Sequence, residues 1–321
     1  MKRVLITKLS SLGDLILALP ALSDAKAALG YIEFDWVVDK NFQEIPLWHP
    51  SVKELFVTNH RAWRKSLTKK ATYQEFSTLY QKLKQKQYDL IIDAHSNIKS
   101  GLLSLIPQGK RAGFDGSSTP EWGSQFFYQE THRASKELHA TERLRILFAS
   151  ALNYPLPSTK PNYQINLAKL KKPDLELPSQ YLIFVPIASH DSKLWPEAYW
   201  KELIAKTVEK GHPILLPWGN LKEQERVERL KIHPLVQVLP KLSLNEIGYL
   251  IANAEGVVSL DTGLSHIAAA LAVPCITLYG PTDPNLTGTV GENQFWARSP
   301  DSMDKISSES IWDNLRRIVS N

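Results

Sequence analysis

Residues 256–280 read GVVSLDTGLSHIAAALAVPCITLYG, and this stretch decides the class of the fold. Its first five and last six residues are short apolar runs of the length expected for buried strands. Residues 264–271, between them, have a helical pattern and follow a turn at Gly263. A strand, a helix and a second strand in this order form a crossover that joins parallel strands. The stretch therefore predicts an α/β fold with a parallel sheet.

The same alternation runs along the whole chain. Apolar runs predict further strands at 4–8, 34–38, 54–58, 89–93, 181–186, 213–217 and 236–240. Helical patterns predict helices near 197–210, 221–231 and 243–253. A helix is also expected after the first strand, where Pro20 should bend or offset it. Helices between strands indicate parallel sheets that are covered on both faces.

A proline-rich stretch separates the two halves of this pattern. Residues 153–180 contain five prolines and little periodicity, which is typical of a linker. We expect one domain over 1–160, a linker over 161–180 and a second domain over 181–321. The last segment should form a helix that packs back on the body through one apolar face, with Ile311, Trp312, Leu315, Ile318 and Val319. Two doubly wound domains bind ligands at the carboxyl ends of their strands, with a cleft between them.

Composition restricts the class of protein and its compartment. The single cysteine, Cys275, excludes an intrachain disulfide framework and a cysteine-based metal site, and it fits a reducing compartment. No apolar run approaches the ~20 residues that a membrane-spanning helix needs. Lys8 and Asp14 interrupt the apolar N-terminus, which argues against a signal peptide. We expect a cytoplasmic protein whose first half, with its excess of basic residues, meets something anionic.

The triplet Asp261-Thr262-Gly263 allows more than one interpretation. Aspartic proteases use two such triplets with paired carboxylates in an all-β fold, whereas this chain has one triplet between a strand and a helix. The unpaired amides at the start of that helix, together with the Thr262 hydroxyl, would form an anion site. Plain capping of the helix by Asp261 or Thr262 is the alternative.

The loop after the first strand, residues 9–14, carries the second candidate group. Asp14 could act as a general base in the cleft. It could equally be the N-cap of the next helix, with Gly13 permitting the turn.

Basic residues mark two further loops. Residues 60–70 hold five lysines and arginines, no acid and one tryptophan, which suits phosphate or carboxylate groups, single-stranded nucleic acid, or simple solvation. Lys193 lies after the strand at 181–186 and could place a point charge on a phosphate.

Taken together, these loops resemble the lipopolysaccharide heptosyltransferases. The similarity rests on LSSLGDLILALPAL (9–22), KLWPEAYW (193–200), PWGNLKEQER (217–226), PKLSLNE (240–246) and SLDTGLSHIAAAL with YGPTDP (259–284). It runs nearly end to end and favours the members that add the first heptose to Kdo on lipid A. The resemblance implies the GT-B fold, with two Rossmann-like domains, and an inverting, metal-independent transfer from ADP-heptose. No Asp-x-Asp motif occurs in the chain.

The resemblance also implies roles for particular residues. Asp14 matches the proposed catalytic base, and Lys193 would stabilise the departing diphosphate. The other donor-site residues implied are Ser189, Glu223 at the ribose, Leu242 near the adenine, Asp261, Thr262, Gly263 and His266. The acceptor-site residues implied are Gly13, Arg61, Arg64 and Lys65. We expect no cofactor and no metal.

This chain departs from its relatives on the acceptor side. It has Ala62 and Pro120 where relatives often have basic residues, and Asp93-Ala94-His95-Ser96 where they often have Asp-Ala-Gln-Gly. The loop 59–75 and the segment 107–135 are expected to be mobile acceptor elements.

The partners expected are ADP-heptose and Kdo-lipid A, with no nucleic acid. We expect a monomer in peripheral contact with the cytoplasmic face of the inner membrane. Three alternatives stay open: a heptosyltransferase acting on a later heptose, a GT-B-like nucleotide-sugar epimerase, and a nucleic-acid-binding protein that uses the basic loop.

Overall fold

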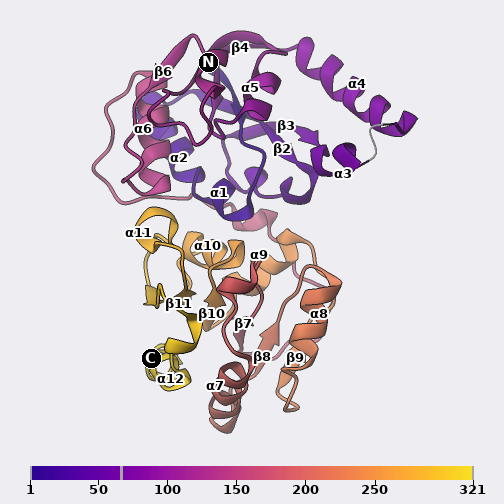
Figure 1. The fold of residues 1–321 in the computed structure, drawn as a ribbon, viewed down its shortest axis with the longest axis vertical. Coiled ribbons are helices and arrows are strands. Elements are labelled where there is room, and N and C mark those ends of the chain that lie inside the picture. Colours follow the sequence, from indigo (N-terminus) through magenta and orange to yellow (C-terminus); the bar gives the residue numbers. More distant parts are fainter. Residues whose placement is uncertain (1, 66–67, 320–321) are drawn as a thin grey trace. The chain divides into compact units, whose positions relative to one another are not determined.

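A computed structural model of the chain describes residues 2–65 and 68–319, apart from the side chains of residues 61, 64 and 65. The chain divides into two compact units, Met1–Asn166 and Leu167–Asn321, and the division lies within the proline-rich stretch 153–180. Each unit carries one six-stranded sheet, and every strand pair in both sheets is parallel (Figure 1). The predicted parallel α/β architecture is confirmed.

The sheet of the first unit has the order β3-β2-β1-β4-β5-β6. Its strands are β1 (Lys2–Thr7), β2 (Ile32–Asp39), β3 (Val52–Thr58), β4 (Gln87–Asp93), β5 (Gln108–Phe114) and β6 (Glu130–His132). In the central strand β1, Val4, Leu5 and Ile6 are completely buried. A continuous apolar run is what a strand covered on both faces requires.

Helices cover both faces of this sheet. They are α1 (Leu12–Ile16), α2 (Leu19–Leu29), α3 (His60–Lys65), α4 (Lys70–Lys84), α5 (Ile98–Ser104) and α6 (Ala140–Leu152). Helices α2 and α6 pack against each other, while α4 contacts β3 and α5 contacts β1 and β4. Pro20 is the second residue of α2, where its missing N–H costs nothing, so the chain starts a new helix there instead of bending one.

The sheet of the second unit has the order β12-β11-β10-β7-β8-β9. Its strands are β7 (Leu182–Val185), β8 (Ile214–Leu216), β9 (Val236–Val238), β10 (Gly256–Leu260), β11 (Cys275–Tyr279) and β12 (Gln294–Arg298). Its helices are α7 (Glu197–Glu209), α8 (Leu221–Glu228), α9 (Leu244–Ala252), α10 (Gly263–Ala270), α11 (Pro284–Thr287) and α12 (Ser308–Val319). The opening stretch is thus β10, α10 and β11, as predicted.

The C-terminal helix packs on its own unit. Helix α12 contacts α7, β10 and β11, with Ile311 and Leu315 completely buried. A side chain at Gly256 would meet Ile318 at 3.0 Å, so the absence of a Cβ in β10 lets the helix approach closely. Within the described residues, no helix has the length and apolar character needed to span a bilayer.

One prediction about loops is wrong, whereas the acceptor role expected of residues 59–75 and 107–135 stays a prediction. Residues 59–75 are not a long loop, because they contain α3 and the start of α4. Residues 107–135 contain β5, β6 and a short 3-10 helix, Ser124–Phe127. The strands β5, β6 and β12 were not predicted. They lie at or next to sheet edges and are partly exposed, so they lack the apolar runs that mark central strands.

Candidate active site

Asp14 is the third residue of α1, which follows the carboxyl end of β1. Its Oδ2 atom accepts hydrogen bonds from the backbone N–H of Ser11 at 2.9 Å and from the Ser11 hydroxyl at 2.6 Å. Ser11 is therefore the N-cap, and the interpretation of Asp14 as the cap is wrong. Among the described residues Oδ1 accepts no hydrogen bond, so it can receive a proton from a bound hydroxyl. Gly13 is buried in the same turn.

A buried lysine beside this carboxylate was missed by the sequence reasoning. Lys8 directly follows β1, is 7% exposed, and donates from Nζ to the carbonyl oxygen of Ala94 at 3.1 Å. Burial lowers the pKa of Lys8, while the charges of Asp14 and Asp93 act in the opposite direction. A charged residue that ends an otherwise apolar strand is the signal that would have identified it.

The surroundings of Asp14 keep it ionised. Burial raises the pKa of its carboxyl, but the charge of Lys8 and the two hydrogen bonds from Ser11 outweigh that effect. The net pKa lies below the usual value. At neutral pH the group is a carboxylate, which is the form that a general base needs.

The turn over residues 93–96 forms a second wall of this region. Asp93 is completely buried; its Oδ2 accepts from the hydroxyls of Tyr128 and Ser100, each at 2.7 Å, and its Oδ1 accepts from two backbone N–H groups of the turn. These contacts make Asp93 a structural carboxylate that shapes the turn. Burial lowers the pKa of His95 to about 4, so its ring is neutral at physiological pH.

The basic segment 60–70 is helical at both ends instead of forming a loop. The backbone of Arg61, Arg64 and Lys65 belongs to α3, but their side chains lie outside the described part of the chain. Their acceptor role stays a prediction.

In the second unit, the structure brings Lys193 and Asp261 together. Lys193 ends a short 3-10 helix, Asp191–Lys193, and its Nζ lies 2.5 Å from Oδ2 of Asp261, the residue after β10. The pair is nearly buried on the aspartate side and half-buried on the lysine side. Sequence placed both residues at strand ends but gave no sign that they pair across 68 positions.

The start of α10 lies directly after this ion pair. Thr262 is the N-cap, and its Oγ1 accepts from the backbone N–H of Leu264 at 3.3 Å. Gly263 is the first helical residue, so the positive end of the helix dipole and the Lys193 ammonium meet at one place. The sequence predicts an anion site here, and that stays a prediction, whereas the capping alternative is confirmed for Thr262. His266 is buried one turn further along the helix.

Two other predicted donor residues line one cavity. Ser189 and Glu223 border a space of about 370 Å³ between the loop after β7 and helix α8. Glu223 Oε2 also accepts from the backbone N–H of Gly219 at 2.7 Å, which fixes the turn before α8. Leu242 precedes α9 and is half-buried, outside the group of described residues that line this cavity.

Arg226 also lines the cavity and was missed, because an arginine on an amphipathic helix gives no distinctive pattern. Its guanidinium donates to the backbone oxygens of Pro186 and Trp195, each at 2.7 Å. It therefore braces the loop that carries Ser189.

Comparisons with known proteins agree with this arrangement. The model of glycosyltransferase family 9 (heptosyltransferase) matches residues 76–314. Lipopolysaccharide heptosyltransferase 1 of Escherichia coli K12 is 40% identical over 316 residues, which is 98% of this chain and 99% of the relative. The chain belongs to glycosyltransferase family 9.

Other members of the family support the same conclusion. Lipopolysaccharide heptosyltransferase 1 of Pseudomonas aeruginosa is 43% identical over 294 residues, 91% of this chain and 82% of the relative. The solved structure of E. coli heptosyltransferase WaaC with ADP matches with a TM-score of 0.92 at 39% identity, covering 98% of this chain and 99% of that one. The predicted GT-B fold is thereby confirmed.

Membership in family 9 makes this chain a heptosyltransferase, an enzyme of lipopolysaccharide core biosynthesis. The epimerase and nucleic-acid-binding alternatives are not favoured. E. coli WaaC has been solved with ADP and with ADP-2-deoxy-2-fluoro heptose, so that relative binds a nucleotide sugar.

Proposed function

We propose that this heptosyltransferase transfers L-glycero-D-manno-heptose from ADP-heptose to Kdo of lipid A, with inversion and without a metal. The observation that carries the proposal is the Asp14 carboxylate, which is ionised beside Lys8 and has one oxygen held by Ser11. The names of relatives about 40% identical to the chain support the choice of the first heptose.

In the proposed reaction Asp14 is the general base. Its Oδ1 removes the proton from the attacking Kdo hydroxyl as the oxygen bonds to the anomeric carbon of the heptose. The bond from that carbon to the diphosphate oxygen breaks, and ADP leaves with the electron pair. A single displacement of this kind inverts the anomeric centre.

The second unit would stabilise the charge that develops on ADP. Lys193 and the amides that begin α10, with the Thr262 hydroxyl, supply a cation and hydrogen-bond donors. In the described residues no group of three His, Cys, Asp or Glu is placed to hold a metal ion. We further propose Ser189, Glu223 and Leu242 for the nucleoside, and Asp261 and His266 for the heptose or the loop.

The proposed acceptor indicates where in the cell the protein acts. Because lipid A is a membrane lipid, we propose peripheral contact with the cytoplasmic face of the inner membrane. Gly13, Arg61, Arg64 and Lys65 are the proposed acceptor residues, and the protein is proposed to act as a monomer.

The decisive test replaces Asp14 by asparagine, which keeps the size of the side chain and its bonds to Ser11. We expect turnover of ADP-heptose with Kdo-lipid A to fall by at least about 10²-fold, the usual contribution of a general base. Binding of ADP, measured by calorimetry, should stay at the wild-type level. Retained turnover would overturn the assignment.

Glu246→Gln is the matched control. Glu246 Oε2 accepts from the backbone N–H and hydroxyl of Ser243 at 2.9 and 2.7 Å, the same arrangement as Asp14 with Ser11. This variant should turn over at the wild-type rate.

A second experiment runs the assay with acceptors that carry one Kdo, two Kdo, phosphorylated Kdo or a first heptose. It identifies the acceptor and separates this function from transfer to a later heptose.

A further inference from the structure

The positive charge of the chain is concentrated in one segment. Residues 60–86 contain eight Lys and Arg and one Glu, a net charge of +7, whereas the rest of the chain has 30 Lys and Arg against 32 Asp and Glu, a net charge of −2. The whole excess of +5 therefore comes from 27 residues. Charge segregated in this way attracts an anionic partner and is more than a means of solubility.

The described part of this segment includes a helix that is only partly packed. Figure 1 shows α4 reaching outward from the sheet of its unit, and of its fifteen residues only Leu79 and Leu83 are buried. Both lie in its second half and contact the core around Phe56. The first two turns of α4 therefore contribute little to the core.

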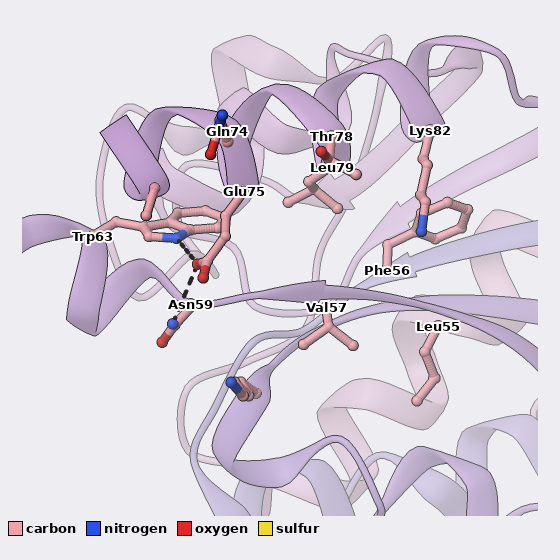
Figure 2. A pocket seen from close by; sticks show the side chains of 12 residues that line it. Leu55, Phe56, Val57, Asn59, Trp63, Gln74, Glu75, Thr78, Leu79 and Lys82 are labelled. Atoms are coloured by element: carbon pink, nitrogen blue, oxygen red, sulfur yellow. Dashed lines mark hydrogen bonds between the residues drawn. The ribbon is translucent and has the colours of Figure 1, made fainter. Parts of the chain in front are cut away.

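A hollow separates these turns from the sheet. It has a volume of about 610 Å³ and lies between Leu55–Val57 of β3 and the Gln74 and Thr78 side of α4 (Figure 2). Glu75, the single acid of the segment, turns toward this side and accepts from the Trp63 indole N–H at 2.7 Å and from Asn59 at 3.4 Å. Its charge thus lies away from the outer face of the helix.

The outer face of α4 carries aromatic and basic side chains. Tyr73, Phe76 and Tyr80 follow the i, i+3, i+7 spacing that places residues on one stripe. Tyr73 is 71% exposed and Phe76 43% exposed. Exposed lysines stand at both ends of the stripe, Lys70 at its start and Lys84 at its end, where the Lys84 ammonium lies 5.7 Å from the centre of the Tyr80 ring.

We propose that this stripe of α4, defined by Lys70, Tyr73, Phe76, Tyr80 and Lys84, docks the protein on an anionic lipid bilayer. Tyrosine side chains lie at the level of the lipid headgroups, because they have an apolar ring and a polar hydroxyl. Lysines beside them pair with anionic headgroups. The proposal rests on the proposed function in one respect, that the acceptor is a lipid, and its test does not depend on turnover.

A second pair of exposed aromatic side chains in the same unit tests whether exposed aromatic rings alone bind a bilayer. Trp122 and Phe126 form an edge-on pair at 5.7 Å and are 75% and 73% exposed. The surrounding segment 115–130 has three acidic residues and no Lys or Arg. Unlike the stripe of α4, this pair has no lysine beside it on its own segment, so it serves as the matched control.

The test compares two double variants of the full-length protein, Tyr73→Ser with Phe76→Ser and Trp122→Ser with Phe126→Ser. Binding is measured by cosedimentation with phosphatidylcholine vesicles, with and without phosphatidylglycerol, at low salt and at about 0.5 M salt, where charges are screened. The wild type and the Trp122 variant should bind the anionic vesicles and release them at high salt. The Tyr73 variant should bind at least about tenfold more weakly.

Two further measurements remove the remaining ambiguity. Lys70→Gln with Lys84→Gln should weaken binding to anionic vesicles by about fivefold for each lysine and leave binding to neutral vesicles unchanged. All variants should keep their circular dichroism spectrum and should bind ADP, measured by calorimetry, with wild-type affinity.

Wild-type affinity in the Tyr73 variant would overturn the proposal, as would equal binding of the wild type to neutral and anionic vesicles. Binding only to vesicles that contain Kdo-lipid A would also overturn it, because the acceptor head and not the bilayer would then be recognised. If the wild-type protein bound anionic vesicles but did not transfer heptose, only the proposed function would be contradicted.

Discussion

Two capping boxes in this molecule have the same geometry and different surroundings. In α1 the Asp14 carboxylate accepts from Ser11 at 2.9 and 2.6 Å, and in α9 the Glu246 carboxylate accepts from Ser243 at 2.9 and 2.7 Å. In each box one carboxylate oxygen receives both bonds. In each, the pKa of the acid lies below its usual value.

The causes of the two shifts differ. The hydrogen bonds from Ser243 are the main cause for Glu246, which is near solvent. For Asp14 the largest effect is burial, which opposes ionisation, and the neighbouring charge of Lys8 helps to overcome it. What distinguishes the box of Asp14 is the buried ammonium of Lys8, and a carboxylate kept ionised in this way is suited to take a proton from a bound group.

The largest effect on the difference between the two capping boxes is expected from Lys8→Met. This substitution keeps the length of the side chain and removes its charge. The effect of burial on Asp14 is then opposed by the hydrogen bonds from Ser11 and by His95 but no longer by Lys8, so the pKa of Asp14 rises. Turnover requires the ionised form, so it is lost as pH falls through that pKa, and the loss should now begin at higher pH. We expect kcat of the variant, relative to the wild type, to fall as pH is lowered and to recover as pH rises. An unchanged pH profile of kcat would mean that Lys8 does not act through Asp14.

A smaller effect is expected from Ser11→Ala. It removes the hydroxyl bond to Asp14 but keeps the backbone bond, so the pKa of Asp14 rises less than in Lys8→Met. The acid side of the kcat profile should move in the same direction as in Lys8→Met and by less. Ser11→Thr, which keeps a hydroxyl at this position, should restore the wild-type profile.

The smallest effect should come from Ser243→Ala in the other box. Loss of an N-cap lowers the free energy of unfolding by about 1 kcal/mol, measured by urea denaturation. Turnover and its pH profile should not change. If the acidic limb of the kcat profile moved in this variant, the two boxes would not differ in their effect on turnover.

Much of the fold could be predicted because its central strands are buried on both faces. The buried part of β1 and the whole of β10 are mostly apolar, and helices with clear start signals follow them. The strand β5, QGKRAGF, is polar and half-exposed, so hydrophobicity gives no sign of it. The basic segment was taken for a loop because α4 buries only two leucines, and a helix that packs so little has a weak apolar pattern.

The site was predictable as a set of positions and not as a set of contacts. Parallel strands bring their carboxyl ends to one edge, which is why Asp14 and Lys193 were found at strand ends. Pairing across a fold depends on three-dimensional distance. The ion pair of Lys193 with Asp261, and the place of Lys8 beside Asp14, therefore became visible only in the structure.

If Lys193 and Asp261 bind the donor as proposed, the ion pair before α10 would link recognition of the two halves of that donor. An anion that takes up Lys193 draws it away from Asp261 and leaves a nearly buried carboxylate facing a second negative group. A nucleotide alone offers Asp261 nothing in exchange, whereas a sugar hydroxyl attached to the same diphosphate can donate to it. In the proposed donor site Asp261 would thus compete for Lys193 and favour an intact nucleotide sugar over the nucleotide that remains after transfer.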